Sequence, residues 1–233
     1  LNSDGTIVAI GGPFNDGTAS RAGHVRVYQY DSSKTDEDTF GPVGWNRLGG
    51  DIDGEASNDF SGWSVSLNAD GTIVAIGADS NDGSGNNAGH VRVYQWDGSA
   101  WNQLGGDIDG EASGDNSGSS VSLSSDGNIV AIGAERNDGN GSNAGHVRIY
   151  QYDSSKTVAV TNQNLSNFGP IGWNRLGSDI DGEASDDNSG ISVSLNSDGT
   201  RVAIGATGSD SGHVRIYQYT VSYTHLRAHE TRP

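Results

Sequence analysis

One pattern occurs four times along this chain of 233 residues. Each copy opens with Leu-x-x-Asp-Gly, continues into Ala-Ile-Gly and then reaches Gly-His-Val-Arg; the opening leucines are Leu1, Leu67, Leu123 and Leu195. Self-similarity of this kind indicates a stack of one structural unit rather than a single mixed core. We therefore expect repeats at about residues 1–66, 67–122, 123–194 and 195–220.

The copies differ in length mainly in one segment. This segment runs from Tyr28 to Trp45 in the first copy, from Tyr94 to Trp101 in the second and from Tyr150 to Trp173 in the third. Tolerance of insertion at one place is typical of a surface loop on a fixed structural unit.

The second copy predicts four short strands, at residues 63–67, 72–77, 90–96 and 101–108. The first two are joined by Ala69-Asp70-Gly71, a hairpin signal, and Val91-Arg92-Val93-Tyr94 alternates with a period of two. The 36 glycines and only 4 prolines fit short strands joined by tight turns. We expect an all-β fold, a β-propeller of four-stranded antiparallel blades. A β-solenoid is the alternative, but its rungs are shorter than these copies.

Residues 117–150 resemble a blade of the FG-GAP repeat family, which builds integrin α-subunit propellers and many bacterial surface proteins. The resemblance rests on the Gly-x-Ser-Val-Ser-Leu start, the Ala-Ile-Gly-Ala block and the Gly-x-Val-x-x-Tyr strand. It extends over residues 1–220. Propellers of this family usually close with seven blades, so the resemblance implies an incomplete ring, with about four blades of seven.

The last thirteen letters, at residues 221–233, match nothing in the repeat. They resemble the translation of a sequencing-library adaptor. We expect this segment to be a non-native tail outside the fold.

Composition excludes several functional classes. The formal net charge of −17 disfavours nucleic acid and anionic membrane surfaces as partners. The absence of cysteine excludes disulfides and thiolate metal sites. No apolar run approaches the length of a membrane span, so we expect no membrane insertion.

Acidic residues concentrate in the loops that join one blade to the next. The motif Asp-Ile-Asp-Gly-Glu-Ala-Ser-x-Asp places acids at positions 1, 3, 5 and 9, a spacing used by Ca²⁺ loops. The candidate calcium ligands are Asp51, Asp53, Glu55, Asp59, Asp107, Asp109, Glu111, Asp115, Asp179, Asp181, Glu183 and Asp187. In the alternative, the acids cap turns and pair with arginine, and Ile52, Ile108 and Ile180 are core residues. The calcium motif of the FG-GAP family, between strands one and two, is replaced here by a short turn.

Two further residue types recur in every full copy. Histidine opens the third strand, at His24, His90, His146 and His213. Packing against the neighbouring blade is the favoured interpretation, and a metal site is the alternative. Tryptophan opens the fourth strand, at Trp45, Trp101 and Trp173. We expect these rings to be core residues, with stacking on sugars as the alternative.

The sequence contains no Ser-His-Asp set, zinc motif or phosphate-binding loop, and its paired carboxylates repeat in each copy. We therefore expect no enzymatic activity. The resemblance implies a secreted or cell-surface propeller for binding or adhesion, with Ca²⁺ as its one expected cofactor and a protein or glycan as its ligand. A lectin-like propeller and an accessory domain of a polysaccharide-active enzyme are the alternatives.

Overall fold

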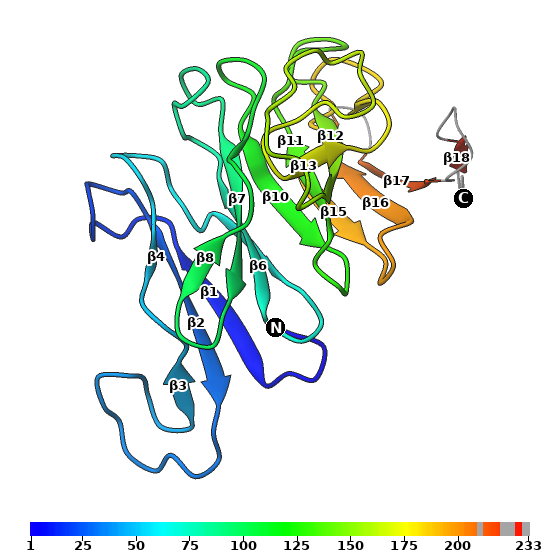
Figure 1. The fold of residues 1–233 in the computed structure, drawn as a ribbon. Helices are drawn as coiled ribbons and strands as arrows, with labels where there is room; N and C mark the ends of the chain where they lie inside the picture. The colour runs from blue at the N-terminus through cyan, green and yellow to red at the C-terminus, as the bar shows by residue number, and fades with distance from the viewer. Residues whose placement is uncertain (209–211, 220–226, 230–233) are drawn as a thin grey trace.

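The computed structural model describes residues 1–208, 212–219 and 227–229. These residues form four antiparallel sheets and no helix. Figure 1 shows the sheets side by side in chain order, from blue to orange. The structure confirms the predicted all-β class with four-stranded blades.

The first two blades share one layout except at the inner edge, where blade 1 has no counterpart of β5 among the described residues. In blade 1, the pairing order is β1–β2–β3, and β4 also pairs with β2. In blade 2, the order is β5–β6–β7–β8, and β9 also pairs with β7. The strands are β1 (Ile7–Gly12), β2 (His24–Tyr30), β3 (Trp45–Arg47), β4 (Ile52–Asp53), β5 (Ser64–Leu67), β6 (Ile73–Ala78), β7 (His90–Trp96), β8 (Trp101–Gln103) and β9 (Ile108–Asp109).

Blade 3 repeats the layout of blade 2, in the order β10–β11–β12–β13 with β14 on β12, and blade 4 has the order β15–β16–β17–β18. Their strands are β10 (Ser117–Leu123), β11 (Ile129–Ala134), β12 (His146–Tyr152), β13 (Trp173–Arg175), β14 (Ile180–Asp181), β15 (Ser192–Leu195), β16 (Arg201–Ala206), β17 (His213–Gln218) and β18 (Arg227–His229). Strand β18 lies in the segment that the sequence assigned to a non-native tail. Residues 221–226 and 230–233 of that prediction lie outside the described residues.

The predicted fourth strand at 101–108 is wrong as one continuous element. It is divided into β8 and β9, which pair with different parts of β7. Gly105 separates them with a φ of +71°, a left-handed conformation that interrupts the strand. The same division occurs at Gly49 and Gly177, each with a φ of +72°.

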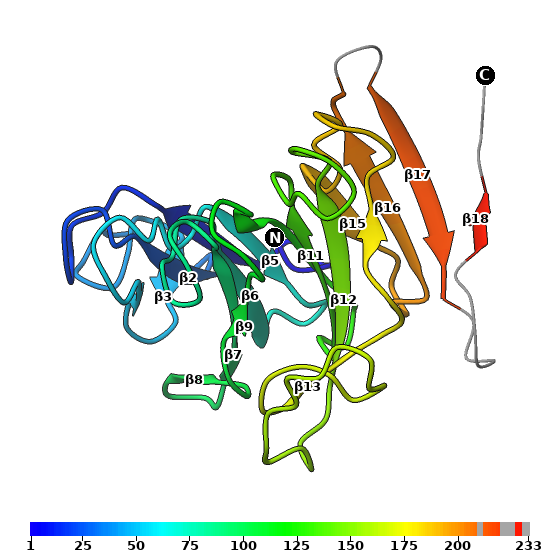
Figure 2. The same ribbon diagram turned by 90° about the horizontal axis from the view of Figure 1, so that it is seen from above.

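The blades follow one another in an arc (Figure 2). At each junction the backbones come into direct contact through glycine. A Cβ atom at Gly11, Gly77 or Gly133 would overlap the carbonyl oxygen of Gly62, Gly118 or Gly190, respectively, in the next blade. The glycine of the Ala-Ile-Gly block therefore sets how closely the blades pack.

The hydrophobic core lies between blades rather than inside one layer. One cluster joins Ile73, Val91 and Val93 of blade 2 to Val130 and Trp173 of blade 3. Equivalent clusters occupy the other two junctions. The loops that leave these junctions are therefore held by the same packing that fixes the blades.

Candidate functional site

Each acidic motif begins where the outer strand of a blade ends. Its isoleucine, Ile52, Ile108 or Ile180, is buried in an inter-blade core cluster. This bears out the core interpretation of the three isoleucines. Because side chains alternate along a strand, the acids on either side point away from that core.

The first acid of the motif pairs with arginine in two blades. Arg26 donates from Nε and Nη2 to the two oxygens of Asp51, both at 2.8 Å, and Arg47 Nη1 adds a bond to Oδ1 at 2.8 Å. Asp179 receives the same set from Arg148, at 2.7 and 2.8 Å, and from Arg175, at 2.8 Å.

These hydrogen bonds change the ionisation of both carboxyls. The bonds from Arg26 lower the pKa of Asp51 below its ordinary value. Burial alone would raise the pKa of Asp179, but the hydrogen bonds and charge of Arg148 outweigh it and lower that pKa. Both carboxyls are therefore ionised and already neutralised by arginine at neutral pH.

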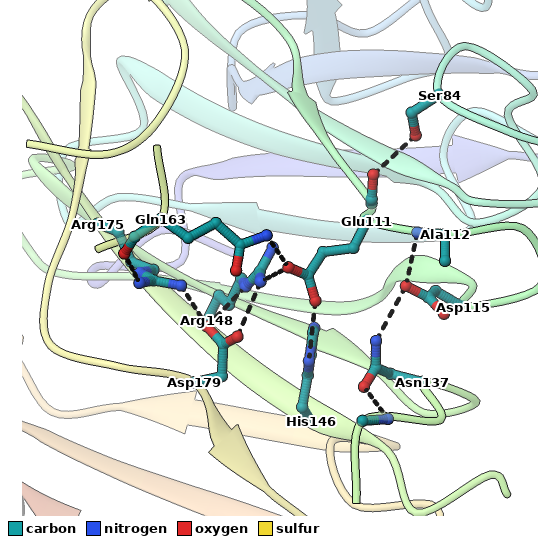
Figure 3. A network of polar contacts seen from close by, with 12 residues as sticks. Ser84, Glu111, Ala112, Asp115, Asn137, His146, Arg148, Gln163, Arg175 and Asp179 are labelled. Carbon is teal, nitrogen blue, oxygen red and sulfur yellow. Dashed lines mark hydrogen bonds and ion pairs between the residues drawn. The ribbon is translucent and has the colours of Figure 1, made fainter. Parts of the chain in front are cut away.

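The glutamate of the motif reaches into the next blade. Glu55 pairs with Arg92 at 3.3 Å, and Glu111 and Glu183 pair in the same way with Arg148 and Arg215. Figure 3 shows the Glu111 contacts: besides Arg148, Gln163 Nε2 donates to Oε1 at 2.6 Å. The glutamate therefore links two blades and, at this junction, the insertion loop of blade 3.

The last acid of the motif closes its own turn. Asp59 accepts from Ala56 N at 2.9 Å and Asp115 from Ala112 N at 3.0 Å, and Asp187 accepts from Glu183 N and Ala184 N at 3.0 and 2.9 Å. Asp59 also accepts from Asn81 Nδ2 of the next blade at 3.1 Å, and Asp115 from Asn137 Nδ2 at 3.0 Å. These acids serve as turn caps and links between blades.

Of the predicted calcium ligands of one loop, Asp51 and Asp53 come together, and they do so with His24. Among the described residues, the groups whose ligand atoms lie within 4.8 Å of one another combine acids with a strand-opening histidine. They are His24 with Asp51 and Asp53, Glu55 with His90 and Asp107, and Glu111 with His146 and Asp179. Asp59, Asp109, Asp115, Asp181, Glu183 and Asp187 are in none of these three groups. Two of the groups span two blades, a placement that spacing within one loop could not reveal.

His24, His90 and His146 are buried in the junctions, as the packing interpretation expects, and His213 in the last blade is half-buried. His90 and His146 are almost inaccessible to solvent. Burial, together with the charge of Arg92, lowers the pKa of His90 to about 4. Burial and the charge of Arg148 lower the pKa of His146. Both imidazoles are neutral at pH 7 and face carboxylates.

The junction between blades 1 and 2 departs from the pattern. Gln103 stands where the other copies have Arg47 and Arg175, and it donates to Asp107 from Nε2 at 2.6 Å. Arg92 does not pair with Asp107. It turns instead to blade 1, where Nη2 donates to the backbone oxygen of Asp53 at 2.8 Å. In the part of the chain that the structure describes, Asp107 has no arginine partner.

A second departure is an exposed aromatic group, which the sequence analysis missed. Phe14, Phe60 and Trp63 contact one another, with ring centroids 5.4 Å apart for Phe14–Phe60 and 6.5 Å for both other pairs. Phe14 is 62% exposed and Trp63 is 48% exposed. We call these three residues the aromatic trio.

The signal for the aromatic trio is visible when the copies are compared. The residue after the last acid is Phe60 in the first copy but Asn116 and Asn188 in the next two. All three adopt a left-handed backbone, with φ of +56°, +54° and +51°. Asparagine tolerates this conformation and phenylalanine does so poorly, so Phe60 marks a strained position.

The repeated tryptophans are structural. Trp101 Nε1 donates to the Leu48 oxygen of the preceding blade at 2.9 Å, and Trp173 Nε1 donates to the Leu104 oxygen at 2.9 Å. Trp173 is fully buried. This arrangement favours the core interpretation over stacking of these rings on sugars.

The insertion loop of blade 3 covers one junction. A cavity of about 280 Å³ lies between the acidic loop of blade 2 and this loop, and its lining includes Glu111, Arg148, Tyr150, Val160 and Phe168. Between blades 1 and 2 a cavity of about 320 Å³ is lined by residues such as Asp51, Asp53, Tyr94 and Trp101. The acidic clusters thus border spaces that could admit a small ligand or ion.

The chain is similar in fold to solved β-propeller structures and in sequence to one repeat family. The chain aligns over 98% of its length with a putative 6-phosphogluconolactonase from Bacteroides uniformis, at 11% identity and a TM-score of 0.54. A second putative 6-phosphogluconolactonase, from Bacteroides fragilis, aligns over 88% of the chain at 11% identity and a TM-score of 0.52. The likeness shows the β-propeller fold. Residues 108–150 match the FG-GAP repeat family, which confirms the resemblance seen in the sequence.

The chain spans about half the length of these solved structures, 52% of the first and 47% of the second. Among curated proteins, none matches the chain in sequence. In the described residues, no helix is long and apolar enough to cross a membrane.

The expectation of no enzymatic activity requires correction. Solved structures with this fold are named as putative 6-phosphogluconolactonases, so the fold is not confined to binding proteins. The acidic motifs repeat in sequence, but the junctions that they form are not all alike. Identical acidic motifs need not be identical sites, because Gln103 and the aromatic trio make one junction different from the others.

Proposed function

We propose that the chain is a ligand-binding propeller of a secreted or cell-surface protein, with adhesion as its role and a protein or glycan as its ligand. The observation that carries this proposal is the aromatic trio. Three large rings lie together at one junction, two of them largely exposed, where the second copy carries Ser80, Asn116 and Ser119 and the third carries a single apolar residue, Ile191. Exposed apolar groups rimmed by polar residues mark interaction sites.

The acidic loops support this proposal by their charge. The half-exposed carboxylate of Glu55 lies in the same loop as Phe60, whereas Asp59 is buried and caps the turn. Carboxylates beside aromatic rings suit a ligand that offers hydroxyl or cationic groups to the carboxylates and an apolar face to the rings. They disfavour polyanions, including nucleic acids.

A glycan ligand is the more specific candidate, and the aromatic trio favours it over the repeated tryptophans. Trp101 holds the preceding blade through its indole nitrogen, so Trp101→Ala would damage the fold before it tested any ligand. Trp63 forms no such bond among the described residues, and its exposed face can stack on a sugar ring.

The test uses the residues that the next junction carries at the same positions. The double variant Phe14→Ser, Trp63→Ser copies Ser80 and Ser119. We expect it to lose binding to immobilised polysaccharides and extracellular-matrix proteins by tenfold or more, with unchanged unfolding. Phe40→Ser is the control, because Phe40 is 61% exposed but lies in an insertion loop. Equal binding by all three proteins would contradict the proposal.

Calcium stabilisation remains a prediction for the inter-blade loops. It is tested by thermal unfolding in EDTA and in millimolar Ca²⁺, with an Asp107→Asn, Asp109→Asn variant beside the parent chain. A rise in melting temperature that shrinks in the variant supports calcium in these loops. No shift assigns the acids to turn capping and arginine pairing.

A further inference from the structure

We propose that Glu55, His90 and Asp107, at the junction between blades 1 and 2, form a binding site for one divalent transition metal ion of the Zn²⁺ type. This site goes beyond the ligand-binding role proposed above and differs from the predicted calcium loops. It combines an imidazole with carboxylates from two blades, whereas the calcium prediction places acids of a single loop around each ion.

The two junctions differ in charge. At the junction between blades 2 and 3, Glu111 and Asp179 are offset by Arg148 and Arg175. At the junction between blades 1 and 2, Arg92 pairs with Glu55, and Asp107 has no arginine partner among the described residues. Gln103 supplies a neutral amide in place of the second arginine. The Glu55–Asp107 pair therefore retains a negative charge that the equivalent pair has lost.

The imidazole of His90 supplies the third ligand. His90 is 2% exposed, and one of its ring nitrogens lies within 4.8 Å of a carboxylate oxygen of both Glu55 and Asp107. Neutral imidazole is a common ligand of Zn²⁺. A metal ion held between the three side chains would satisfy this ring nitrogen at a junction from which water is largely excluded.

The geometry is close to that of a metal site. The three ligand atoms lie within 4.8 Å of one another. A tetrahedral site with bonds of about 2.1 Å needs separations of about 3.4 Å between ligand atoms. The side chain of Glu55 is 48% exposed and can rotate to close this gap. Three protein ligands would leave one coordination position open to water or to an oxygen of a ligand.

The donor set selects the kind of ion. Ca²⁺ and Mg²⁺ prefer oxygen ligands, and the site has only two carboxylates. Imidazole nitrogen with carboxylate oxygen suits Zn²⁺, Co²⁺ and related ions. We therefore expect Zn²⁺ to bind at least tenfold more tightly than Ca²⁺.

The test is calorimetric titration of the full chain with Zn²⁺, followed by Co²⁺ and its visible absorption bands. His225 and His229 of the tail also offer imidazoles, so the parent chain carries His225→Asn and His229→Asn. We expect one ion per chain. Glu55→Gln removes a ligand from an exposed position, and Gln103→Arg restores the residue that blades 1 and 3 carry. Each is expected to weaken Zn²⁺ binding tenfold or more.

Glu183→Gln is the matched control, because Glu183 has the same motif position at the junction between blades 3 and 4. We expect this variant to leave the affinity for Zn²⁺ unchanged. Three outcomes would each overturn the proposal. The first is no binding of Zn²⁺, and the second is binding of about three ions per chain with equal affinity for Zn²⁺ and Ca²⁺. The third is Zn²⁺ binding that neither Glu55→Gln nor Gln103→Arg weakens. Gln103→Arg changes neither the aromatic trio nor the carboxylate beside it, so this variant tests the metal site separately from the ligand-binding role.

Discussion

The carboxylate of Asp115 accepts a hydrogen bond at 3.0 Å from the Asn137 side-chain amide of the next blade, and both residues are buried. Asn137 also accepts a hydrogen bond from Gly139 N at 2.8 Å. The same side chain therefore stabilises its own loop and the acidic loop that contains Asp115. The same relationship joins Asp59 to Asn81 at 3.1 Å. These links make the junctions polar at their loop ends and apolar between their strands.

Asn137→Ala is expected to lower the free energy of unfolding by about 1–3 kcal/mol, because it leaves a buried carboxylate oxygen with fewer donors. Urea unfolding measures this change. Asn15→Ala is the control, since Asn15 accepts from Gly17 N and, within the described residues, makes no bond to another blade. Equal losses in the two variants would mean that the link between blades contributes nothing.

Arg148→Ala is expected to lower the free energy of unfolding by about 3–5 kcal/mol. The Arg148 side chain is 6% exposed, and its removal leaves the carboxylates of Asp179 and Glu111 without their arginine partner at this position. Arg26→Ala removes the same two-pronged bond to Asp51, but Arg26 is 40% exposed, and the cost is expected to be about 1 kcal/mol or less. Chemical unfolding of both variants tests the difference. A similar loss in both would contradict the role assigned to burial.

Asp79→Asn is expected to stabilise the protein at neutral pH. Burial raises the pKa of Asp79 from 3.8 to about 6. Between pH 3.8 and 6 the folded state therefore holds a proton that the unfolded state has lost, so this group's contribution to stability falls as pH rises and is lowest above pH 6. The variant should gain about 1–2 kcal/mol at pH 7.5 and little at pH 3.5. A gain that does not depend on pH would refute this account.

Phe60→Asn is expected to raise the free energy of unfolding by about 0.5–1 kcal/mol while weakening ligand binding. The left-handed backbone suits asparagine, and Asn116 at the equivalent position donates to the Asp79 oxygen at 2.9 Å. The reciprocal change Asn116→Phe should destabilise the protein by about 2 kcal/mol. Unfolding and binding are measured on the same preparations. A loss of stability in Phe60→Asn would show that ring contacts outweigh the backbone strain.

Gly77→Ala is expected to destabilise the protein by about 2–4 kcal/mol, because the added methyl group would overlap the Gly118 carbonyl oxygen of the next blade. Gly50→Ala is the matched control, since a Cβ atom there meets nothing within 4 Å. Thermal unfolding distinguishes the two. Comparable melting temperatures would mean that the blades can move apart without cost.

The sequence was sufficient to predict the fold because the same strand pattern recurs in register. His90–Trp96 matches β7 in full. The division of the outer strand was missed because it depends on the left-handed backbone at Gly105, which alternating polarity does not reveal. The candidate site was predicted only in part. The acids are in the expected loops, but their partners come from the next blade, as when Glu55 meets Arg92, and only the packing of blades brings them together.

The departures at Gln103 and Phe60 were visible in the sequence from the start, since each replaces a residue that the other full copies share. Their consequences for the site are visible only in the structure. Gln103 matters because Asp107 then lacks the arginine that its counterparts have, and Phe60 because its backbone is left-handed.

The glycine contact between blades bears on how such a protein can gain blades during evolution. Blade 2 supplies Gly62 to its contact with blade 1 and Gly77 to its contact with blade 3, and blade 3 supplies Gly118 and Gly133 in the same way. The surfaces are head-to-tail, so a blade that carries both glycines can follow another of the same kind. Duplication of one unit within the gene would add a blade with both of its junctions already matched, and lineages could change blade number without evolving a new interface.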